Sequence, residues 1–345
     1  MQPNTPSTCF SARRLNASTF LIVEDDKWGE YPLIYAKVYD GVVVLVDTGC
    51  GGAARDEGVE VKRLREFLET VPVQDVDGDA DGGEEGDGER SNARPINEVG
   101  KRGYVVLCTH CHYDHIGAVE QFPDAAIWAS AFDESFITDP KAFPTHSLCR
   151  FVGMKTPRYE VARWAEHGAR VTYSPTSTTN DAVDLGLVIY HTPGHTPDSL
   201  SIFDEQERVL LVGDTAYEWA PILFPIESSI YIYKRSLEFL LALVHRLNCP
   251  ASSSPPTSSS PLRLASGHIT SDVDAEDFLQ EVYSFLCEVQ TGTLEPRFYR
   301  RFRGEEEVLY ERGDGRVSFA GPRRKFEGWI GKGGTRLRGG CCVVL

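Results

Sequence analysis

Five potential metal ligands lie within six consecutive residues, directly after the apolar run Tyr104–Cys108. They are His110, Cys111, His112, Asp114 and His115. Imidazole and carboxylate groups together are the set that zinc and iron-like divalent ions bind in proteins. Because side chains alternate along an extended backbone, His110 and His112 should face one way and Cys111 the other. Asp114 and His115 follow in a tighter turn that could serve a second ion, so this segment indicates two metals side by side.

Three further polar residues follow predicted strands in the same manner. His195 comes after the strand Leu185–Tyr190, Asp214 follows Val209–Val212, and His268 ends a strand that begins at Leu262. Layered sheets carry functional side chains at strand ends and loops, where a rigid backbone lets side chains converge. Five imidazoles and two carboxylates exceed what one tetrahedral ion needs. They are enough for two ions that share a bridging carboxylate.

The remaining elements must position these side chains. Further strands are expected at Thr19–Val23, Leu33–Val46 (a hairpin turning at Asp40-Gly41), Ser199–Phe203 and in a hairpin of Glu307–Tyr310 with Val317–Ala320, and helices at Val59–Glu69, from Ala118, at Val161–Gly168, Lys234–Leu247 and Asp274–Val289. Strands that alternate with helices predict a layered α/β architecture. An acidic Gly-rich segment and a Ser/Pro tract interrupt the motif series rather than separate it. We therefore expect one domain over residues 15–322, with mobile insertions at about 75–97 and 250–261, and a basic tail at 323–345.

Composition limits the classes of function. The 345 residues carry a net charge of −16, which disfavours nucleic acid as a partner because phosphate binding needs a basic surface. No apolar run approaches the roughly 18 residues of a membrane span, and the N-terminus lacks the order of a signal peptide. The nine cysteines are odd in number and mostly scattered, which favours a reduced, cytoplasmic setting over a disulfide scaffold. We expect a small-molecule substrate, and no pattern specifies an oligomeric state.

The motif series resembles that of the metallo-β-lactamase-fold hydrolases across most of residues 20–270. The matching segments are His110-x-His112-x-Asp114-His115, Thr192-Pro193-Gly194-His195, Gly213-Asp214-Thr215 and Gly267-His268, preceded by Asp47 in Leu45-Val46-Asp47-Thr48-Gly49. The resemblance implies an α/β fold, a four-layer αββα sandwich with the metals in a groove at one edge. It implies one metal on His110, His112 and His195, and another on Asp114, His115 and His268. Asp214 would bridge the two, and Asp47 would orient ligands from outside the coordination sphere.

The same resemblance implies hydrolysis at a binuclear centre with two Zn²⁺ per chain. A metal-bridging hydroxide would attack a small-molecule ester, lactone or acyl thioester. Asp114 would orient this nucleophile and shuttle its proton. Tyr217, three residues after Asp214, is similar to a residue of the lactonase branch and would hydrogen-bond the developing oxyanion. Asp214 in place of a cysteine at the third motif disfavours the best-known β-lactamase class, whereas lactone and glyoxalase II-like thioester hydrolysis both stay open.

Two other functions also stay open. Persulfide dioxygenases resemble this motif set but use one iron, so iron is an alternative cofactor and metal identity separates the two readings. A catalytically inactive, membrane-tethered binding protein is the third, but a decayed site would be expected to have lost ligands.

The C-terminus carries a possible lipidation motif. Cys342-Val343-Val344-Leu345 fits the Cys-aliphatic-aliphatic-X prenylation pattern, and Cys341 could take a second lipid by palmitoylation. Six basic residues between positions 323 and 338 would add attraction to anionic lipid. In a eukaryotic host we expect anchoring at the cytosolic face of a membrane, and Cys342→Ser should move the protein to the soluble fraction.

Overall fold

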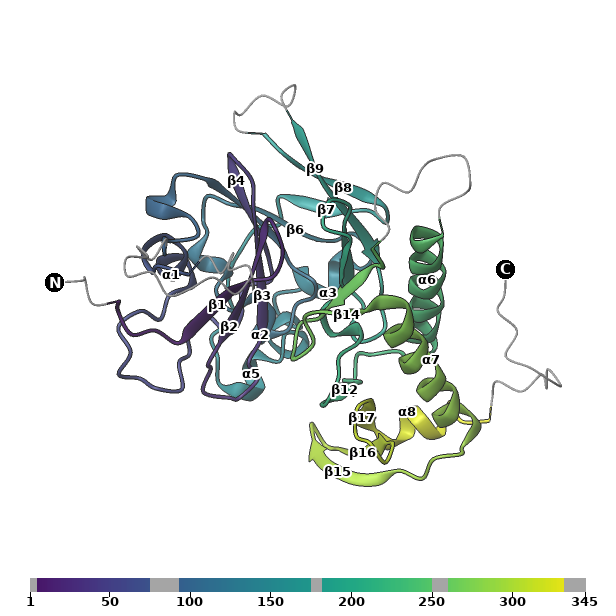
Figure 1. Cartoon of the computed structure of the whole chain (residues 1–345). Helices are drawn as coiled ribbons and strands as arrows, with labels where there is room; N and C mark the ends of the chain where they lie inside the picture. The colour runs from purple at the N-terminus through teal and green to yellow at the C-terminus, as the bar shows by residue number, and fades with distance from the viewer. Residues whose placement is uncertain (1–4, 75–92, 175–181, 250–259, 332–345) are drawn as a thin grey trace, which may run out of the picture.

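A computed structural model describes residues 5–74, 93–174, 182–249 and 260–331 (Figure 1). Its strands are β1 Phe10–Arg14, β2 Thr19–Glu24, β3 Leu33–Val38, β4 Val42–Val46, β5 Gly103–Leu107, β6 Ala126–Ser130, β7 Arg163–Ala165, β8 Ala169–Tyr173, β9 Val183–His191, β10 Leu200–Asp204, β11 Val209–Leu211, β12 Pro221–Leu223, β13 Arg263–Ala265, β14 Val273–Asp274, β15 Arg297–Phe302, β16 Glu305–Glu311 and β17 Ser318–Pro322. Its helices are α1 Leu64–Thr70, α2 Tyr113–Ile116, α3 Glu134–Thr138, α4 Phe143–His146, α5 Cys149–Val152, α6 Ile230–Asn248, α7 Ala275–Thr291 and α8 Arg323–Glu327, with 3₁₀ turns η1 Glu98–Gly100, η2 Val119–Gln121 and η4 Gly213–Thr215. Within these ranges, none of the helices has the length and apolar character to span a membrane.

The first sheet contains seven strands in chain order, β1 to β7. Strands β1 to β4 pair antiparallel, whereas β4, β5, β6 and β7 run parallel to one another. Successive side chains of β4 point to opposite faces. Val44 and Val46 therefore pack toward the second sheet, and Val43 and Leu45 pack toward the outer helices. Burial on both faces explains why this strand is apolar at every position.

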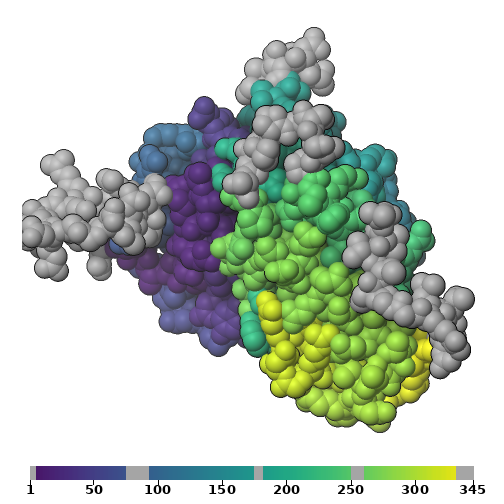
Figure 2. All heavy atoms as spheres, turned by 45° about the vertical axis from the view of Figure 1, so that its right-hand side comes forward, coloured from purple at the N-terminus to yellow at the C-terminus, as the bar shows by residue number. Residues whose placement is uncertain are grey.

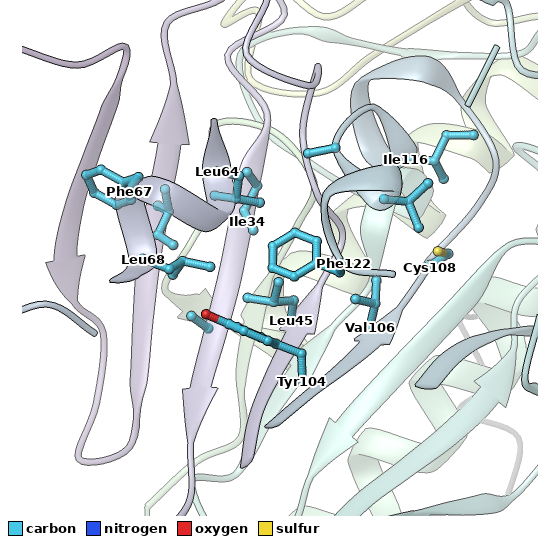
Figure 3. Packing of buried hydrophobic residues seen from close by; sticks show 14 of the residues in the cluster. Ile34, Leu45, Leu64, Phe67, Leu68, Tyr104, Val106, Cys108, Ile116 and Phe122 are labelled. Atoms are coloured by element: carbon cyan, nitrogen blue, oxygen red, sulfur yellow. The ribbon is translucent and has the colours of Figure 1, made fainter. Parts of the chain in front are cut away.

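The second sheet and the helices complete four layers. Its six strands have the order β14-β13-β11-β10-β9-β8, and its inner face shares an apolar layer with the first sheet. Helices α6 and α7 cover its outer face, while α1 and the shorter helical turns cover the outer face of the first sheet. Figure 3 shows Leu64 and Leu68 of α1, with Phe122, lying over Leu45 and Val106. The four-layer αββα sandwich predicted from the sequence is confirmed.

A four-stranded sheet of order β12-β17-β16-β15 extends the second half of the chain. The predicted hairpin near residues 307–320 is confirmed as β16 and β17. Figure 2 shows the last described residues, in yellow, lying against the green segments before them. The predicted basic tail at 323–345 is wrong for residues 323–331, because Phe326 and Trp329 are 0% and 1% exposed and belong to the core beneath α6 and α7.

The basic character of that tail is also reduced. Arg323 pairs with Glu306 at 2.8 Å, and Arg324 pairs with Glu305 at 2.9 Å. Both arginines are therefore partly neutralised by the last sheet before any lipid is considered. The lipidation candidates Cys341 and Cys342 lie outside the described residues.

Other sequence-based boundaries need correction. The helix predicted at Val161–Gly168 is wrong, because this segment contains β7, which pairs with β6 and extends the first sheet. Most of the predicted insertion at 75–97 lies outside the described residues, but Ile96 and Asn97 are buried, so the insertion ends before them. The other predicted insertion, 250–261, also falls almost wholly outside.

Candidate metal centre

The predicted ligands reach one site from the ends of several strands. Asp47 follows β4, His110 to His115 follow β5, and His195, Asp214 and His268 follow β9, β11 and β13. Parallel pairing of β4 with β5, and of β11 with β13, brings their carboxyl ends to the same edge of each sheet. Ligands commonly bind at such carboxyl edges in α/β proteins.

One group of ligands consists of His110, His112, His195 and Asp214. All four are buried, and their ligand atoms lie within 4.8 Å of one another. Nδ1 of His112 is 3.0 Å from Nε2 of His110 and 3.0 Å from Nε2 of His195. Burial lowers the pKa of His110 and His195, and lowers that of His112 to about 3. Neutral imidazoles that converge on one point are the form in which histidine binds metals.

The second group consists of Asp114, His115 and His268, which are equally buried and within the same limit. Oδ2 of Asp114 is 3.5 Å from Nε2 of His115 and 3.2 Å from Nε2 of His268. Burial alone would lower the pKa of both histidines, but the carboxylates of Asp214 and Asp114 raise both well above the usual value. The negative charge concentrated here therefore favours a cation, whether a proton or a metal ion.

Asp214 joins the two groups. Its Oδ1 lies 3.3 Å from Nε2 of His115, in the second group. Its Oδ2 lies 3.6 Å from Nε2 of His195 in the first group and 3.5 Å from Nε2 of His268 in the second. One carboxylate thus lies within 3.6 Å of histidines in both groups, which is the position that a bridging ligand requires.

Asp47 orients one histidine of each group, His115 directly and His110 through Thr109. Its Oδ2 is 2.8 Å from Nδ1 of His115, which leaves Nε2 of that ring facing the site. The same carboxylate accepts hydrogen bonds from the amide and the hydroxyl of Thr109, each at 2.7 Å, and this hydroxyl lies 3.1 Å from Nδ1 of His110. These contacts are those of the orienting residue that the sequence predicted.

Two supports were missed in the sequence. Nδ1 of His195 is held by the carbonyl of Leu223 at 2.8 Å, and Nδ1 of His268 by the carbonyl of Glu30 at 2.9 Å. The Glu30 side chain is itself fixed by the hydroxyl of Tyr113, which donates to its Oε1 at 2.5 Å. Every residue has a backbone carbonyl, so no residue type in the sequence could have marked these two.

Two observations show that the residues present fit metal ions. Nε2 of His115 and Oδ1 of Asp214 are among the few buried side-chain atoms of the described residues without a hydrogen-bond partner, although such atoms are nearly always paired. A Cβ on Gly267 would lie 2.5 Å from Oδ1 of Asp214 and 2.6 Å from Cε1 of His115. Unpaired ligand atoms thus face a space that a glycine keeps free of side chain.

The structure also bears on two expectations about single residues, the oxyanion role of Tyr217 and the orientation of Cys111. The hydroxyl of Tyr217 donates to the carbonyl of Pro221 at 3.0 Å, and its ring lies edge-on to His268 at 5.6 Å. Its proton is therefore committed to the backbone, and the predicted oxyanion role does not fit this conformation. Cys111 is 1% exposed and packs in the core on the helix-covered face, which confirms that it faces away from the ligands.

Comparison with known proteins agrees with this geometry. A family model described as "Metallo-beta-lactamase superfamily" matches residues 158–252. Over 291 residues the chain is 31% identical to a protein of Aspergillus versicolor named "Putative transcription factor avaE", covering 84% of this chain and 79% of that protein. The chain belongs to the metallo-beta-lactamase superfamily.

Other members of the superfamily are more distant. The acyl-coenzyme A thioesterase MBLAC2 of Gallus gallus is 27% identical over 158 residues, which are 44% of this chain and 56% of the thioesterase. The chain therefore spans only about half the length of that relative. A solved superfamily protein from Sulfolobus tokodaii aligns over 81% of this chain and 86% of its own, with 14% identity and a TM-score of 0.45.

Proposed function

We propose that this superfamily member is a binuclear metal-dependent hydrolase of small-molecule acyl esters, with acyl thioesters as its substrates. The observation that carries the proposal is the position of Asp214, whose carboxylate lies between two groups of buried ligands, 3.6 Å from His195 of the first and 3.3 and 3.5 Å from His115 and His268 of the second. A single-ion site would need only one of these groups.

The ligand set favours zinc in both positions. His110, His112 and His195 would hold one ion, Asp114, His115 and His268 the other, and Asp214 would contribute to both. When bound, such ions supply a nucleophile by lowering the pKa of water, and they polarise the carbonyl under attack.

The chain's own residues provide orientation and proton transfer. Asp114 lies beside His115 and His268 and is 6% exposed, so it can take the proton of the attacking water and pass it to the leaving group. Asp47 keeps His115 in one tautomer by accepting its Nδ1 proton. Burial of all these groups excludes bulk water and strengthens each electrostatic contact.

Two observations favour thioesters over lactones. The lactonase expectation rested on Tyr217, whose hydroxyl is occupied by Pro221. A thiol has a pKa near 8.5 and leaves as a thiolate with little help from a proton donor, so a thioesterase needs no phenol at this place. The likeness to an acyl-coenzyme A thioesterase supports the same choice.

The alternatives are supported less well. A persulfide dioxygenase with one iron would leave the second group of ligands unused. A binding protein without activity would not need Asp47 and Thr109 to fix the histidine rings. The name of the Aspergillus relative refers to transcription, but a net charge of −16 disfavours binding to a phosphate backbone.

Metal analysis and a substrate screen test the proposal together. Zinc-loaded protein should hold two ions per chain and should hydrolyse acyl thioesters faster than lactones. Asp114→Ala should lower this activity by about 100-fold or more, whereas Asp56→Ala, at an exposed loop carboxylate, should not change it. Purification with iron and no zinc, or thioester hydrolysis that survives Asp114→Ala, would contradict the proposal.

A further inference from the structure

Three exposed apolar side chains beside the metal centre share an unusual backbone. Tyr31, Trp219 and Ile269 are 40%, 60% and 51% exposed, and their φ angles are 50°, 61° and 55°. Left-handed backbone is unfavourable for residues other than glycine, and a β-branched residue such as isoleucine is a clear outlier there. Among the described residues, one other large apolar side chain combines exposure with a positive φ, and this is Val99.

Tyr31 and Ile269 flank the same histidine from two segments. Ile269 follows His268 directly in the chain. The carbonyl that holds Nδ1 of His268 belongs to Glu30, the residue before Tyr31. The two apolar side chains are therefore each one residue away from the two ends of a single hydrogen bond in the metal centre.

Trp219 is tied to the same place through its neighbours. The amide of Glu218 donates to Oγ1 of Thr270 at 2.8 Å, and this hydroxyl donates back to the Glu218 carboxylate at 3.1 Å. These two bonds join the residue before Trp219 to the residue after Ile269. We name Tyr31, Trp219 and Ile269 the apolar rim. Val99 lies instead in η1, before the amino end of β5, whereas the ligands follow its carboxyl end.

We propose that the apolar rim binds the acyl chain of the substrate, so that the enzyme prefers medium and long uncharged acyl groups over acetyl. This inference rests on the proposed function and adds a substrate class to it. Scattered exposed apolar residues need no explanation, but backbone strain persists mainly where function retains it. Because three strained apolar residues lie close in sequence or by hydrogen bonds to one candidate ligand, we treat them as one functional surface rather than as isolated exposed residues.

The charge beside the rim supports an uncharged chain as the occupant. Glu30 is exposed, and its carboxylate accepts a hydrogen bond from the hydroxyl of Tyr113. Two arginines lie at the rim, and each is paired with a carboxylate. Arg55 stacks over the Tyr31 ring at 4.7 Å and pairs with Asp25 at 3.1 Å, and Arg316 pairs with Glu218 at 2.8 Å. Because both arginines are already engaged by carboxylates, they offer little attraction to a charged acyl group, whereas an alkyl chain needs none.

The expected selectivity follows from one-sided burial. A methylene that contacts a surface on one side gains about half of full burial, which is about twofold in binding. Between acetyl and hexanoyl thioesters of N-acetylcysteamine, kcat/KM should therefore rise about 16-fold. This leaving group carries no phosphate, so the comparison reports on the acyl side alone.

Glycine substitutions separate the rim's function from its stability. In the double variant Trp219→Gly/Ile269→Gly, strain is relieved and apolar surface is removed, so the melting temperature should hold or rise while the 16-fold preference falls to about 2-fold. The matched control is Val99→Gly, which relieves the same strain at the opposite edge and should leave the preference unchanged. A preference retained in the double variant, or lost equally in the control, would overturn the proposal.

A binding measurement keeps this test apart from the proposed function. Calorimetric titration of zinc-loaded protein with decanoate and with acetate should show tighter binding of decanoate, and the double variant should lose the difference. If no thioester is hydrolysed, this result still supports the rim while the proposed function fails. If the rim instead covers a second copy of the chain, the double variant should dissociate a dimer in solution without changing the decanoate titration, and the proposal is refuted.

Discussion

Replacing Gly267 by alanine is the sharpest perturbation of the metal centre that leaves every ligand in place. The new Cβ would lie 2.5 Å from Oδ1 of Asp214 and 2.6 Å from Cε1 of His115. Gly267 has no φ in the left-handed region, so alanine causes no backbone strain of its own. The perturbation therefore acts first on the Asp214 carboxylate and one imidazole, and the next nearest atom is the carbonyl carbon of Gly213 at 3.4 Å.

The expected loss of metal affinity follows from the overlap between the new Cβ and Oδ1 of Asp214. An ordinary contact begins at 3.4 Å, so Oδ1 of Asp214 must retreat by about 0.9 Å if it takes up the whole overlap. Metal–ligand distances tolerate about 0.2 Å. A displaced bridging ligand should weaken metal binding by more than the 10–100-fold typical of losing an outer support, so we expect at least about 100-fold weaker binding of one ion.

Chelator competition measures this loss directly. Zinc-loaded Gly267→Ala should release one ion to a chelator that leaves both ions in the wild type, and hydrolysis should fall by about 100-fold or more. Gly313→Ala is the matched control, because a Cβ there meets nothing within 4 Å and its φ is ordinary. Two zinc ions held with unaltered affinity by Gly267→Ala would refute the assignment of Asp214 and His115 as ligands of closely placed metals.

Three further outcomes are expected. Asp47→Asn removes the charge that holds Nδ1 of His115 and should weaken metal affinity about 10–100-fold in a chelator titration; equal loss in Asp56→Asn, at an exposed carboxylate, would assign the effect to net charge instead. Chelation of wild-type protein should lower the melting temperature by about 5 °C, since ligand at 100 times its Kd contributes about 2.7 kcal/mol; a melting temperature independent of zinc concentration would argue against a resident metal. Phe326→Ala, at a fully buried ring, should lower the free energy of unfolding in urea by about 3–5 kcal/mol, whereas Phe298→Ala, 58% exposed, should change it by less than about 0.5 kcal/mol; similar values would return residues 323–331 to a loose tail.

The sandwich could be predicted from the sequence because its strands are buried on both faces. An uninterrupted run such as Val42–Val46 can satisfy two apolar layers only as a central strand. Edge strands have no such signal. The segment around β7 has no regular alternation: Val161, Ala162, Trp164 and Ala165 are apolar and are mixed with polar residues, and pairing with β6 decides its conformation. The local spacing of apolar residues predicted a helix there, but hydrogen-bonded pairing with the neighbouring strand makes the segment a strand.

The two groups of candidate ligands could be predicted because chemistry limits the residue types that bind divalent ions. His110, His115 and Asp214 stand out on that ground alone. The groups that orient the histidine rings could be predicted only in part. Asp47 can be recognised by its residue type, but the backbone carbonyls of Leu223 and Glu30 cannot. The strained backbone of the apolar rim was equally hidden, because a positive φ at a residue other than glycine leaves no trace in residue type.

The C-terminal sheet takes part in the metal centre rather than standing beside it. Its strand β12 ends at Leu223, whose carbonyl fixes the ring of His195. That strand pairs with β17, and the amide of Phe224 donates to the carbonyl of Ala320 at 2.7 Å. The core around Phe326 therefore holds β17, β17 holds β12, and β12 orients a ligand of the first group. Residues beyond 270, where the motif series has ended, therefore help to keep one histidine turned toward the other candidate ligands.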